Sequence, residues 1–354
     1  MEHKNKLSDT LAYFQSKETH TVNFQESAIE QAYMTEAPKQ TLPIKVLSIL
    51  GGLLTAIAFF GFLLITGFYQ SGIALTCIGV LAISAGAILS QKHDSILLDT
   101  ISISSVIIGF ILVGVGMAEL DVSEKTIPLF FITIALLCFF LAKSYMLTFV
   151  STLIAHGSIF AYLMSSNQPS LIPIYVALLG ILIGYVYLKE AKLIGLSTFM
   201  ARRYNPLKIA LIFAFVSGLM FLRGAFLPQV HPYFLLVTST TSTILILYVT
   251  HTILNVFAVT KWSTKSLAYF LTLLTLAPTA VTPGISGALL LLLLGFLTNY
   301  KTGFVIGGIS LLYFIGQCYY DLQFTLLTKS ILLFASGIFF LVLYLFIAKR
   351  HEQH

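Results

Sequence analysis

The sequence predicts an all-α fold, a polytopic integral membrane helix bundle with about 12 transmembrane helices. Hydrophobic residues make up 57% of the chain and charged residues only 10%, whereas a soluble globular domain carries about 25% charged residues. From Ile44 to Ala348, long apolar stretches are separated only by short polar segments. A soluble core cannot hide so much apolar surface, so lipid must be the solvent for most of the chain.

The individual spans follow from length, because a helix needs roughly 20 apolar residues to cross the hydrocarbon core. Polar or proline-containing segments such as 91–94, 167–170 and 228–232 break or hydrate a helix and separate the apolar stretches. The spans predicted in this way are 45–68, 71–90, 96–118, 126–142, 146–164, 171–188, 206–227, 232–259, 266–281, 284–299, 302–318 and 328–348.

The placement of Lys and Arg predicts the orientation. If the N-terminus is cytosolic and the loops alternate, the inside receives Lys39, Lys45, Lys92, Lys143, Lys189, Lys192, Arg202, Arg203, Lys208, Lys261, Lys265, Lys301, Lys349 and Arg350. The outside receives only Lys125, Arg223 and Lys329. This bias predicts that both termini are cytosolic. The net charge of +6 therefore indicates contact with anionic lipid headgroups, and no nucleic-acid partner is expected.

Three regions follow from these predictions. Residues 1–42 form a cytosolic amphipathic N-terminal tail, residues 43–348 the transmembrane helical domain, and residues 349–354 a short cytosolic tail. The first region has no apolar core of a signal peptide, and Leu7 and Leu11 share one helical face. The tail lies on the bundle or bilayer, or it docks a partner.

Metal and cofactor motifs are absent from the sequence. The three cysteines, Cys77, Cys138 and Cys318, show neither a disulfide spacing nor a metal-ligand spacing. The sequence also lacks a phosphate loop, a nucleophile elbow and a dinucleotide-binding fingerprint. We therefore expect no metal site, no cofactor and no catalytic residue of these types.

The uncharged stretch 266–299 contains a candidate helix break. Pro278, Pro283 and Gly284 lie in its middle, and each proline removes a backbone donor. Short, proline-interrupted segments mark binding sites in transporters. The alternative is a tight turn between two short spans. Both alternatives, a re-entrant hairpin and two spans, remain open at this stage.

The span 232–259 is the most polar one. Thr241, His251 and Asn255 fall near one helical face, where they either form hydrogen bonds between helices or line a hydrated cavity. His156 is alone in its span and reads as a core histidine. Asp99, one turn inside a cytosolic helix end, either reaches the interface or acts as a protonatable carboxylate.

Ionisable groups near the outer face give the main site prediction. Arg223 lies about one turn inside the end of its predicted span, where an unpaired charge is costly. It either reaches outward to the interface or pairs with an outer acidic group, with Asp321 preferred over Glu119. We predict the pair with Asp321.

Three neighbours complete this predicted outer cluster. Tyr319 and Tyr320 are expected at the level of the headgroups, as aromatic residues are at membrane interfaces. Lys329 either joins the cluster or binds phosphate headgroups. Separately, the small-residue spacings 180–184 and 303–307 predict close helix packing.

Several short motifs carry a resemblance to a known family. They are Leu42-Pro43-Ile44-Lys45-Val46-Leu47, Gly51-Gly52, Phe59-Phe60-Gly61-Phe62-Leu63, Ala277-Pro278, Pro283-Gly284-Ile285 and Tyr319-Tyr320-Asp321-Leu322. With them the chain resembles the bacterial polytopic membrane proteins of domain-of-unknown-function family 4401. The resemblance implies a bacterial inner membrane location and implies nothing about a substrate.

Two functions fit these observations. The span number, the candidate break and the intramembrane polar groups favour a small-solute or lipid-linked permease. A non-catalytic scaffold that binds a membrane or periplasmic protein is the alternative, because no charge is predicted deep in mid-span. A lipid transferase would need an outer acid or base, for which Asp321 and His231 are the only candidates. Membrane lipids are expected partners in each case.

Overall fold

The computed structural model describes residues 42–65, 71–91, 96–222 and 232–321, with a few single positions between 327 and 341. All regular structure in these ranges is helical, which confirms the all-α prediction. The helices are α3 (Leu42–Ile65), α4 (Gly72–Leu89), α5 (Ile96–Glu119), α6 (Thr126–Leu141), α7 (Tyr145–Ser165), η2 (Pro169–Leu171), α8 (Ile172–Leu188), α9 (Glu190–Leu196), α10 (Thr198–Phe221), α11 (Pro232–Val256), α12 (Trp262–Leu276), η3 (Ala277–Val281), α13 (Pro283–Leu297) and α14 (Lys301–Asp321).

The chain divides into two compact units, Met1–Leu50 and Gly51–His354. Of the first unit, the described residues cover only the start of α3. The second unit holds the end of α3 and all helices from α4 to α14. The arrangement described below is that of α4 to α14.

Seven helices in the described ranges are long and apolar enough to cross a membrane. They contain the segments Gly72–Leu89, Asp99–Glu119, Tyr145–Ser165, Pro169–Leu188, Thr198–Phe221, Tyr233–Val256 and Lys301–Tyr320. Two further apolar helices, α6 and α13, have 16 and 15 residues, which span about 22–24 Å against a hydrocarbon thickness of about 30 Å. The count of about 12 spans stays a prediction.

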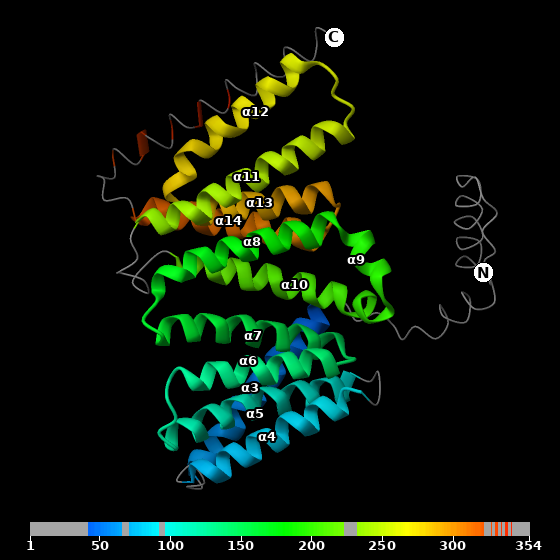
Figure 1. Cartoon of the computed structure of the whole chain (residues 1–354), viewed down its shortest axis with the longest axis vertical. Helices are drawn as coiled ribbons and strands as arrows, with labels where there is room; N and C mark the ends of the chain where they lie inside the picture. The colour runs from blue at the N-terminus through cyan, green and yellow to red at the C-terminus, as the bar shows by residue number, and fades with distance from the viewer. Residues whose placement is uncertain are drawn as a thin grey trace, which may run out of the picture. The chain divides into compact units, whose positions relative to one another are not determined.

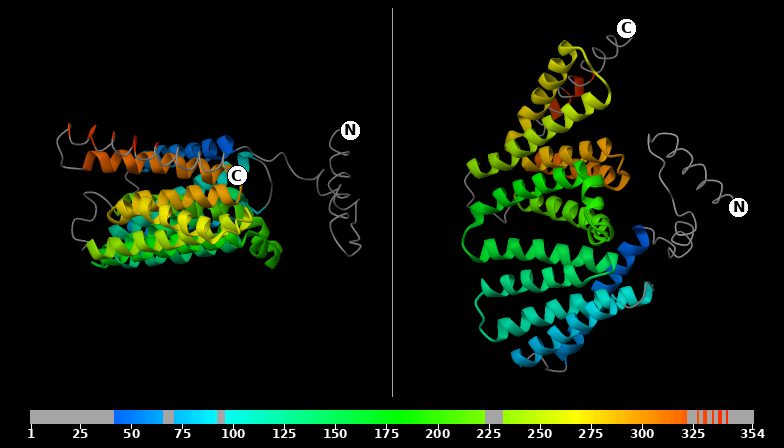
Figure 2. Two further views of the ribbon diagram at one scale, coloured as in Figure 1. Left: turned by 90° about the horizontal axis from the view of Figure 1, so that it is seen from above. Right: turned by 45° about the vertical axis from the view of Figure 1, so that its right-hand side comes forward.

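Helices that follow one another in the chain form antiparallel pairs. The closest pairs are α4 with α5, α6 with α7, and α13 with α14. The connections alternate between the two ends of the helices, with α6–α7, α8–α9–α10 and α11–α12 at one end and α5–α6 and α7–α8 at the other (Figures 1 and 2). Helix α10 is central, because it packs on α7, α8, α9, α13 and α14.

The α4–α5 pair is held by small residues at intervals of seven. Gly72, Gly79 and Gly86 of α4 face α5, and the antiparallel register is constant: a Cβ built at each would lie 2.7 Å, 2.8 Å and 2.6 Å from the carbonyl oxygens of Gly116, Gly109 and Ser102, respectively. The Ser102 hydroxyl also donates a hydrogen bond of 2.7 Å to the Gly86 carbonyl oxygen. The backbones of the two helices therefore touch, as they do where membrane helices associate through small residues.

The largest buried cluster surrounds α10. Phe215 of α10 is completely buried among side chains of α8, α11 and α13. Glycines allow the helices to approach: a Cβ at Gly284 would lie 2.5 Å from the ring of Phe314 on α14, so only glycine fits this contact. This core holds α8, α10, α11 and α13 together, and Phe314 of α14 joins it.

Helix α10 begins earlier than predicted. The expected span 206–227 starts at Pro206, but the helix starts at Thr198 and contains that proline. Ser197 caps it, because its hydroxyl oxygen accepts a hydrogen bond of 3.2 Å from the Met200 backbone N–H. Hydropathy could not show this extension, since residues 198–205 include the polar residues Arg202, Arg203 and Asn205. The short helix α9 also lies where a loop was expected.

The candidate break in 266–299 is a turn between two helices. Helix α12 ends at Leu276, a short 3-10 helix follows, and α13 begins at Pro283. Pro278 and Pro283 lie in the first positions of η3 and α13, where a missing backbone N–H costs no hydrogen bond. The prolines therefore lie in a turn between two helices, and both alternatives, a re-entrant hairpin and two spans, stay predictions.

Candidate functional site

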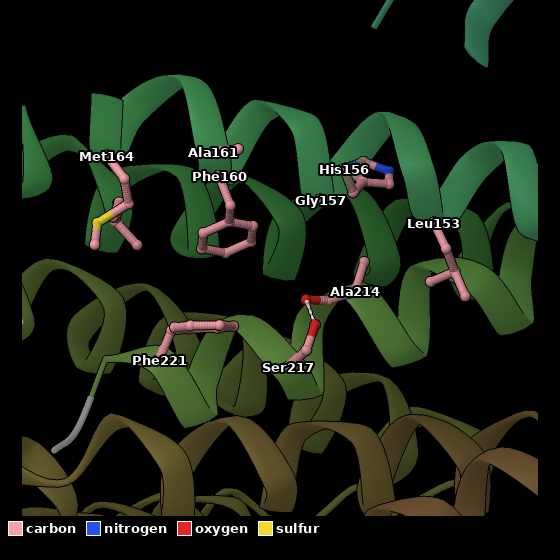
Figure 3. A pocket seen from close by; sticks show the side chains of 10 residues that line it. Leu153, His156, Gly157, Phe160, Ala161, Met164, Ala214, Ser217 and Phe221 are labelled. Atoms are coloured by element: carbon pink, nitrogen blue, oxygen red, sulfur yellow. Dashed lines mark hydrogen bonds between the residues drawn. The ribbon is translucent and has the colours of Figure 1, made fainter. Parts of the chain in front are cut away.

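A pocket of about 320 Å³ lies between α7, α8 and α10 (Figure 3). From α7 it is lined by Leu153, His156, Gly157, Phe160, Ala161 and Met164, and from α8 and α10 by Ile172, Ala214, Ser217 and Phe221. The walls are mainly apolar, with His156 as the only ionisable side chain among them. A volume above about 300 Å³ is in the range of small-molecule sites.

The polar groups of this pocket are held by defined partners. His156 Nδ1 forms a short hydrogen bond with the Tyr175 hydroxyl of α8, which leaves Nε2 as the second polar atom of the ring. The Ser217 hydroxyl donates a hydrogen bond of 3.0 Å to the Ala214 carbonyl oxygen (Figure 3). Phe160 packs edge-on against Tyr175, with 5.1 Å between ring centroids. The pocket thus offers an apolar wall with a few oriented polar groups.

A buried lysine lies in α10, earlier in the chain than the pocket residues of that helix. Lys208 is 2% exposed, and its Nζ atom lies 3.0 Å from Glu190 Oε2 of α9. The same Nζ atom lies 4.0 Å, 4.7 Å and 5.2 Å from the ring centroids of Tyr300, Tyr187 and Tyr204. A buried ammonium group is costly unless it is paired, and here one carboxylate and three aromatic rings offset that cost. We call Lys208, Glu190 and these three tyrosines the lysine cage.

One hydroxyl of the lysine cage has no partner among the described residues. Tyr187 is 2% exposed, and its hydroxyl oxygen is buried without a hydrogen bond. It lies against Gly303, where a Cβ would collide with this oxygen. By contrast, the Tyr204 hydroxyl donates to the Val186 carbonyl oxygen at 2.8 Å. An unsatisfied buried hydroxyl costs about 1–3 kcal/mol. The Tyr187 hydroxyl can therefore donate a hydrogen bond to an acceptor on a molecule that binds at this site.

Tyr300 lies in the connection between α13 and α14. Burial raises the pKa of its hydroxyl, a hydrogen bond from Thr302 lowers it, and the negative charge of Glu190 raises it. The net direction is upward, so the hydroxyl stays neutral and can donate a hydrogen bond at physiological pH.

Arg203 joins α10 to the end of α6. It is 7% exposed, and its guanidinium donates to the carbonyl oxygens of Phe139 at 3.1 Å and Phe140 at 3.0 Å, and to that of Ala142. It also lies 3.7 Å from the ring centroid of Phe199. These carbonyls are the groups that a helix leaves unpaired at its C-terminus, so Arg203 caps α6 with a positive charge.

The predicted polar residues of 232–259 form a network between α11 and α12. His251 Nδ1 lies 2.7 Å from the Tyr269 hydroxyl, and Asn255 Nδ2 lies 3.0 Å from His251 Nε2. Lys265 donates to Asn255 Oδ1 at 3.4 Å. The structure therefore brings His251 and Asn255 together in hydrogen bonds between helices. Thr241 is ten residues earlier, about 15 Å along the helix, and does not join this network.

The predicted outer cluster lies partly outside the described residues. Arg223 and Lys329 are not among them, and Asp321 is described only as the last residue of α14. Tyr319 and Tyr320 end the same helix with their ring centroids 5.7 Å apart, and Tyr320 is 81% exposed. The predicted pair of Arg223 with Asp321 stays a prediction.

Asp99 lies in the first turn of α5 and is half-buried. A carboxylate in this position interacts favourably with the positive end of the helix dipole. In the described part of the chain, no group of three His, Cys, Asp or Glu side chains that could hold a metal ion is present.

Sequence reasoning did not identify the lysine cage. In the sequence, Lys208 and Arg203 indicate only topology, and the position of His156 predicts a core residue. One signal was available, because Lys208 lies inside a predicted span, and an ionisable residue there is by default a candidate functional group. Its partner Glu190 is 18 residues earlier in the chain, and no spacing rule connects the two.

The comparisons with known proteins place the chain in a family without adding a function. No curated protein and no solved structure matches the chain. The apolar helices and the family together support a transmembrane protein. The family match covers residues 41–350, and the chain belongs to the family described as Domain of unknown function (DUF4401).

Proposed function

We propose that the chain is a multi-pass permease of a bacterial inner membrane that carries a small apolar or lipid-linked solute. The observation that supports this function is the pocket between α7 and α10, which contains His156 and Ser217. Such a pocket, mostly apolar with a few convergent polar groups, is typical of ligand sites between the helices of a bundle. The polar atoms of His156 and Ser217 would orient the polar part of the solute, and Phe160 and Phe221 would contact its apolar part.

The pocket and the lysine cage lie at different depths of one helix. Ser217 follows Lys208 by nine residues, about 13 Å along α10. In the lysine cage, Lys208 is packed against tyrosine rings and paired with Glu190, whereas the pocket retains free volume. In the proposed permease, the pocket is open toward the end of the bundle at which α7 ends. The path is closed near the lysine cage.

The distribution of charge supports the proposed orientation, with both termini in the cytosol. The connections α6–α7, α8–α9–α10 and α11–α12 lie at one end of the bundle (Figure 1). With the first turn of α12, they carry Lys143, Lys189, Lys192, Lys261 and Lys265 and one carboxylate, Glu190. The α5–α6 connection at the other end carries Asp121, Glu124 and one cation, Lys125. Positive charge collects on the cytosolic side of membrane proteins.

Cysteine labelling tests this orientation. In a variant without the three native cysteines, Val122→Cys in the α5–α6 connection is expected to react with an impermeant thiol reagent in intact cells. Lys192→Cys on α9 serves as the control and should react only after the membrane is permeabilised. The reverse pattern would show that the proposed orientation is wrong.

Filling the pocket tests the permease proposal. A Cβ at Gly157 would have nothing within 4 Å, so the first atom of the Gly157→Leu side chain meets open space at the wall of the pocket. We expect this variant to keep or raise its stability, because glycine in a helix costs about 1 kcal/mol relative to alanine. It should lose the rise in melting temperature that a bound solute gives the wild type across a panel of metabolites and lipids.

The matched control for this variant is Gly308→Leu. Gly308 lies in α14 and also has open space at its Cβ position, but it does not line the pocket. It should respond to solutes as the wild type does. If no member of the panel stabilises the wild type and a second protein co-purifies with it, a scaffold function replaces the permease.

A further inference from the structure

The lysine cage differs from an ordinary ion pair in how its two charges are held. Lys208 is 2% exposed, whereas the Glu190 side chain is 41% exposed. Glu190 is the first residue of a helix of only seven residues. The cation is therefore fixed in the protein, while the carboxylate lies at the surface, where ion pairs contribute little to stability. Another anion could replace the carboxylate without unfolding the site.

More donors surround this position than one carboxylate uses. The Tyr187 hydroxyl, buried and without a partner among the described residues, faces the first turn of α14 at Gly303. The first N–H groups of a helix have no partner within the helix, and the N-terminus of a helix attracts anions. Lys208 Nζ lies 4.7 Å from the centroid of the Tyr187 ring, so an ammonium, a hydroxyl and a helix N-terminus lie in one region.

The surroundings of the lysine cage are positively charged. Lys189 and Lys192 lie on either side of Glu190 in the sequence, and Lys301 is the first residue of α14. All three are exposed. With Lys208, the short segments 189–192 and 301 and the buried site thus contribute four cations and one carboxylate, Glu190, and among the described residues only Lys208 pairs with Glu190. Phosphate fits this excess, since it carries more negative charge and more acceptor oxygens than a carboxylate.

We propose that the lysine cage is a binding site for a phosphate group, which takes the place of the Glu190 carboxylate beside Lys208. Lys208 Nζ and the Tyr187 hydroxyl donate hydrogen bonds to the phosphate oxygens, and the first turn of α14 adds its N–H groups. Glu190 closes the site in the absence of the ligand. The phosphate comes either from a lipid headgroup or from a soluble compound. This site is separate from the pocket at Gly157, so it can fail or succeed independently of the permease proposal.

The test measures how phosphate changes the melting temperature of the full-length protein in a maltoside detergent, which carries no phosphate. In one arm, inorganic phosphate is titrated. In the other, phosphate-free buffer is used and phosphatidic acid is added to the micelles. A rise in the first arm assigns a soluble phosphate, and a rise in the second assigns a headgroup. Absence of a rise in both arms overturns the proposal.

Three variants identify the site. Glu190→Gln removes the competing carboxylate and should lower the concentration of phosphate needed for half of the effect by about tenfold, as the loss of a charge-assisted hydrogen bond predicts. Lys208→Met combined with Glu190→Gln leaves no buried charge and should abolish the response. Glu124→Gln, which removes a carboxylate in the α5–α6 connection, should respond as the wild type does.

Tyr187→Phe separates binding from packing. It removes a buried hydroxyl that has no partner among the described residues, so the unliganded protein should not lose stability. The response to phosphate should nevertheless fall several-fold, which a purely structural tyrosine would not cause. A full response in this variant, or in the variant that lacks both Lys208 and Glu190, contradicts the site.

Discussion

Gly109→Ala is expected to destabilise the α4–α5 pair. A Cβ at Gly109 would lie 2.6 Å from the Gly79 carbonyl oxygen and 2.9 Å from the Ile83 backbone nitrogen. These are backbone atoms in the middle of a helix, so the two helices must separate to make room. Overpacking costs about 1–3 kcal/mol, and the loss of backbone contact along the pair adds to it. Thermal unfolding in detergent should show a clearly lower midpoint.

The matched control for this prediction is expected to change the stability in the opposite direction or not at all. Gly308→Ala adds the same methyl group to α14, where nothing lies within 4 Å. Because alanine favours a helix over glycine by up to about 1 kcal/mol, this variant should be neutral or slightly more stable. If Gly109→Ala is as stable as Gly308→Ala, the helices do not touch as described.

The sequence predicted the helices well where hydropathy alone determines them. Helices α4, α7 and α8 begin and end close to the predicted spans 71–90, 146–164 and 171–188. Lipid requires each backbone polar group to bond within its own helix, so an apolar stretch of this length has one favoured structure. The predicted start of α10 was wrong because a helix can extend through polar residues beyond its apolar stretch. Hydropathy does not detect such an extension.

Contacts between helices were predictable only where a known spacing marks them. The four-residue spacing 303–307 indicated close packing, and a Cβ at Gly307 would lie 2.7 Å from the Leu292 backbone nitrogen. The seven-residue spacing of Gly72, Gly79 and Gly86 repeats in α5 at Ser102, Gly109 and Gly116. This spacing does not by itself predict a helix contact. Only the antiparallel register shows that the two sets meet.

The candidate site shows the same limit for charged groups. The cost of an intramembrane charge predicts a pair of Arg223 with Asp321, whereas the structure describes a pair of Lys208, in the middle of α10, with Glu190 of α9. The physical argument, that a buried cation needs a partner, holds for Lys208. Which acid supplies that partner depends on how α9 folds back, and no local pattern records this.

Arg203→Met is expected to destabilise the contact between α6 and α10. The guanidinium bonds three carbonyl oxygens at the end of α6, those of Phe139, Phe140 and Ala142. Methionine has a similar volume and apolar stem but cannot donate hydrogen bonds, so these three carbonyl oxygens lose the donors of the guanidinium. Since an unsatisfied buried group costs about 1–3 kcal/mol and the bond to Ala142 is buried, the loss should reach at least about 1–3 kcal/mol, seen as a fall in the unfolding midpoint.

Arg202→Met provides the matched control, because Arg202 is the next residue along α10 and its side chain is exposed. This variant removes the same charge from the same turn and should unfold near the temperature of the wild type. Arg203→Lys should fall between the two, since an ammonium is a compact charge that cannot match the planar fork of the guanidinium. If Arg203→Met and Arg202→Met are equally stable, the hydrogen bonds of Arg203 to the end of α6 do not contribute to stability, and any loss comes from the change in net charge.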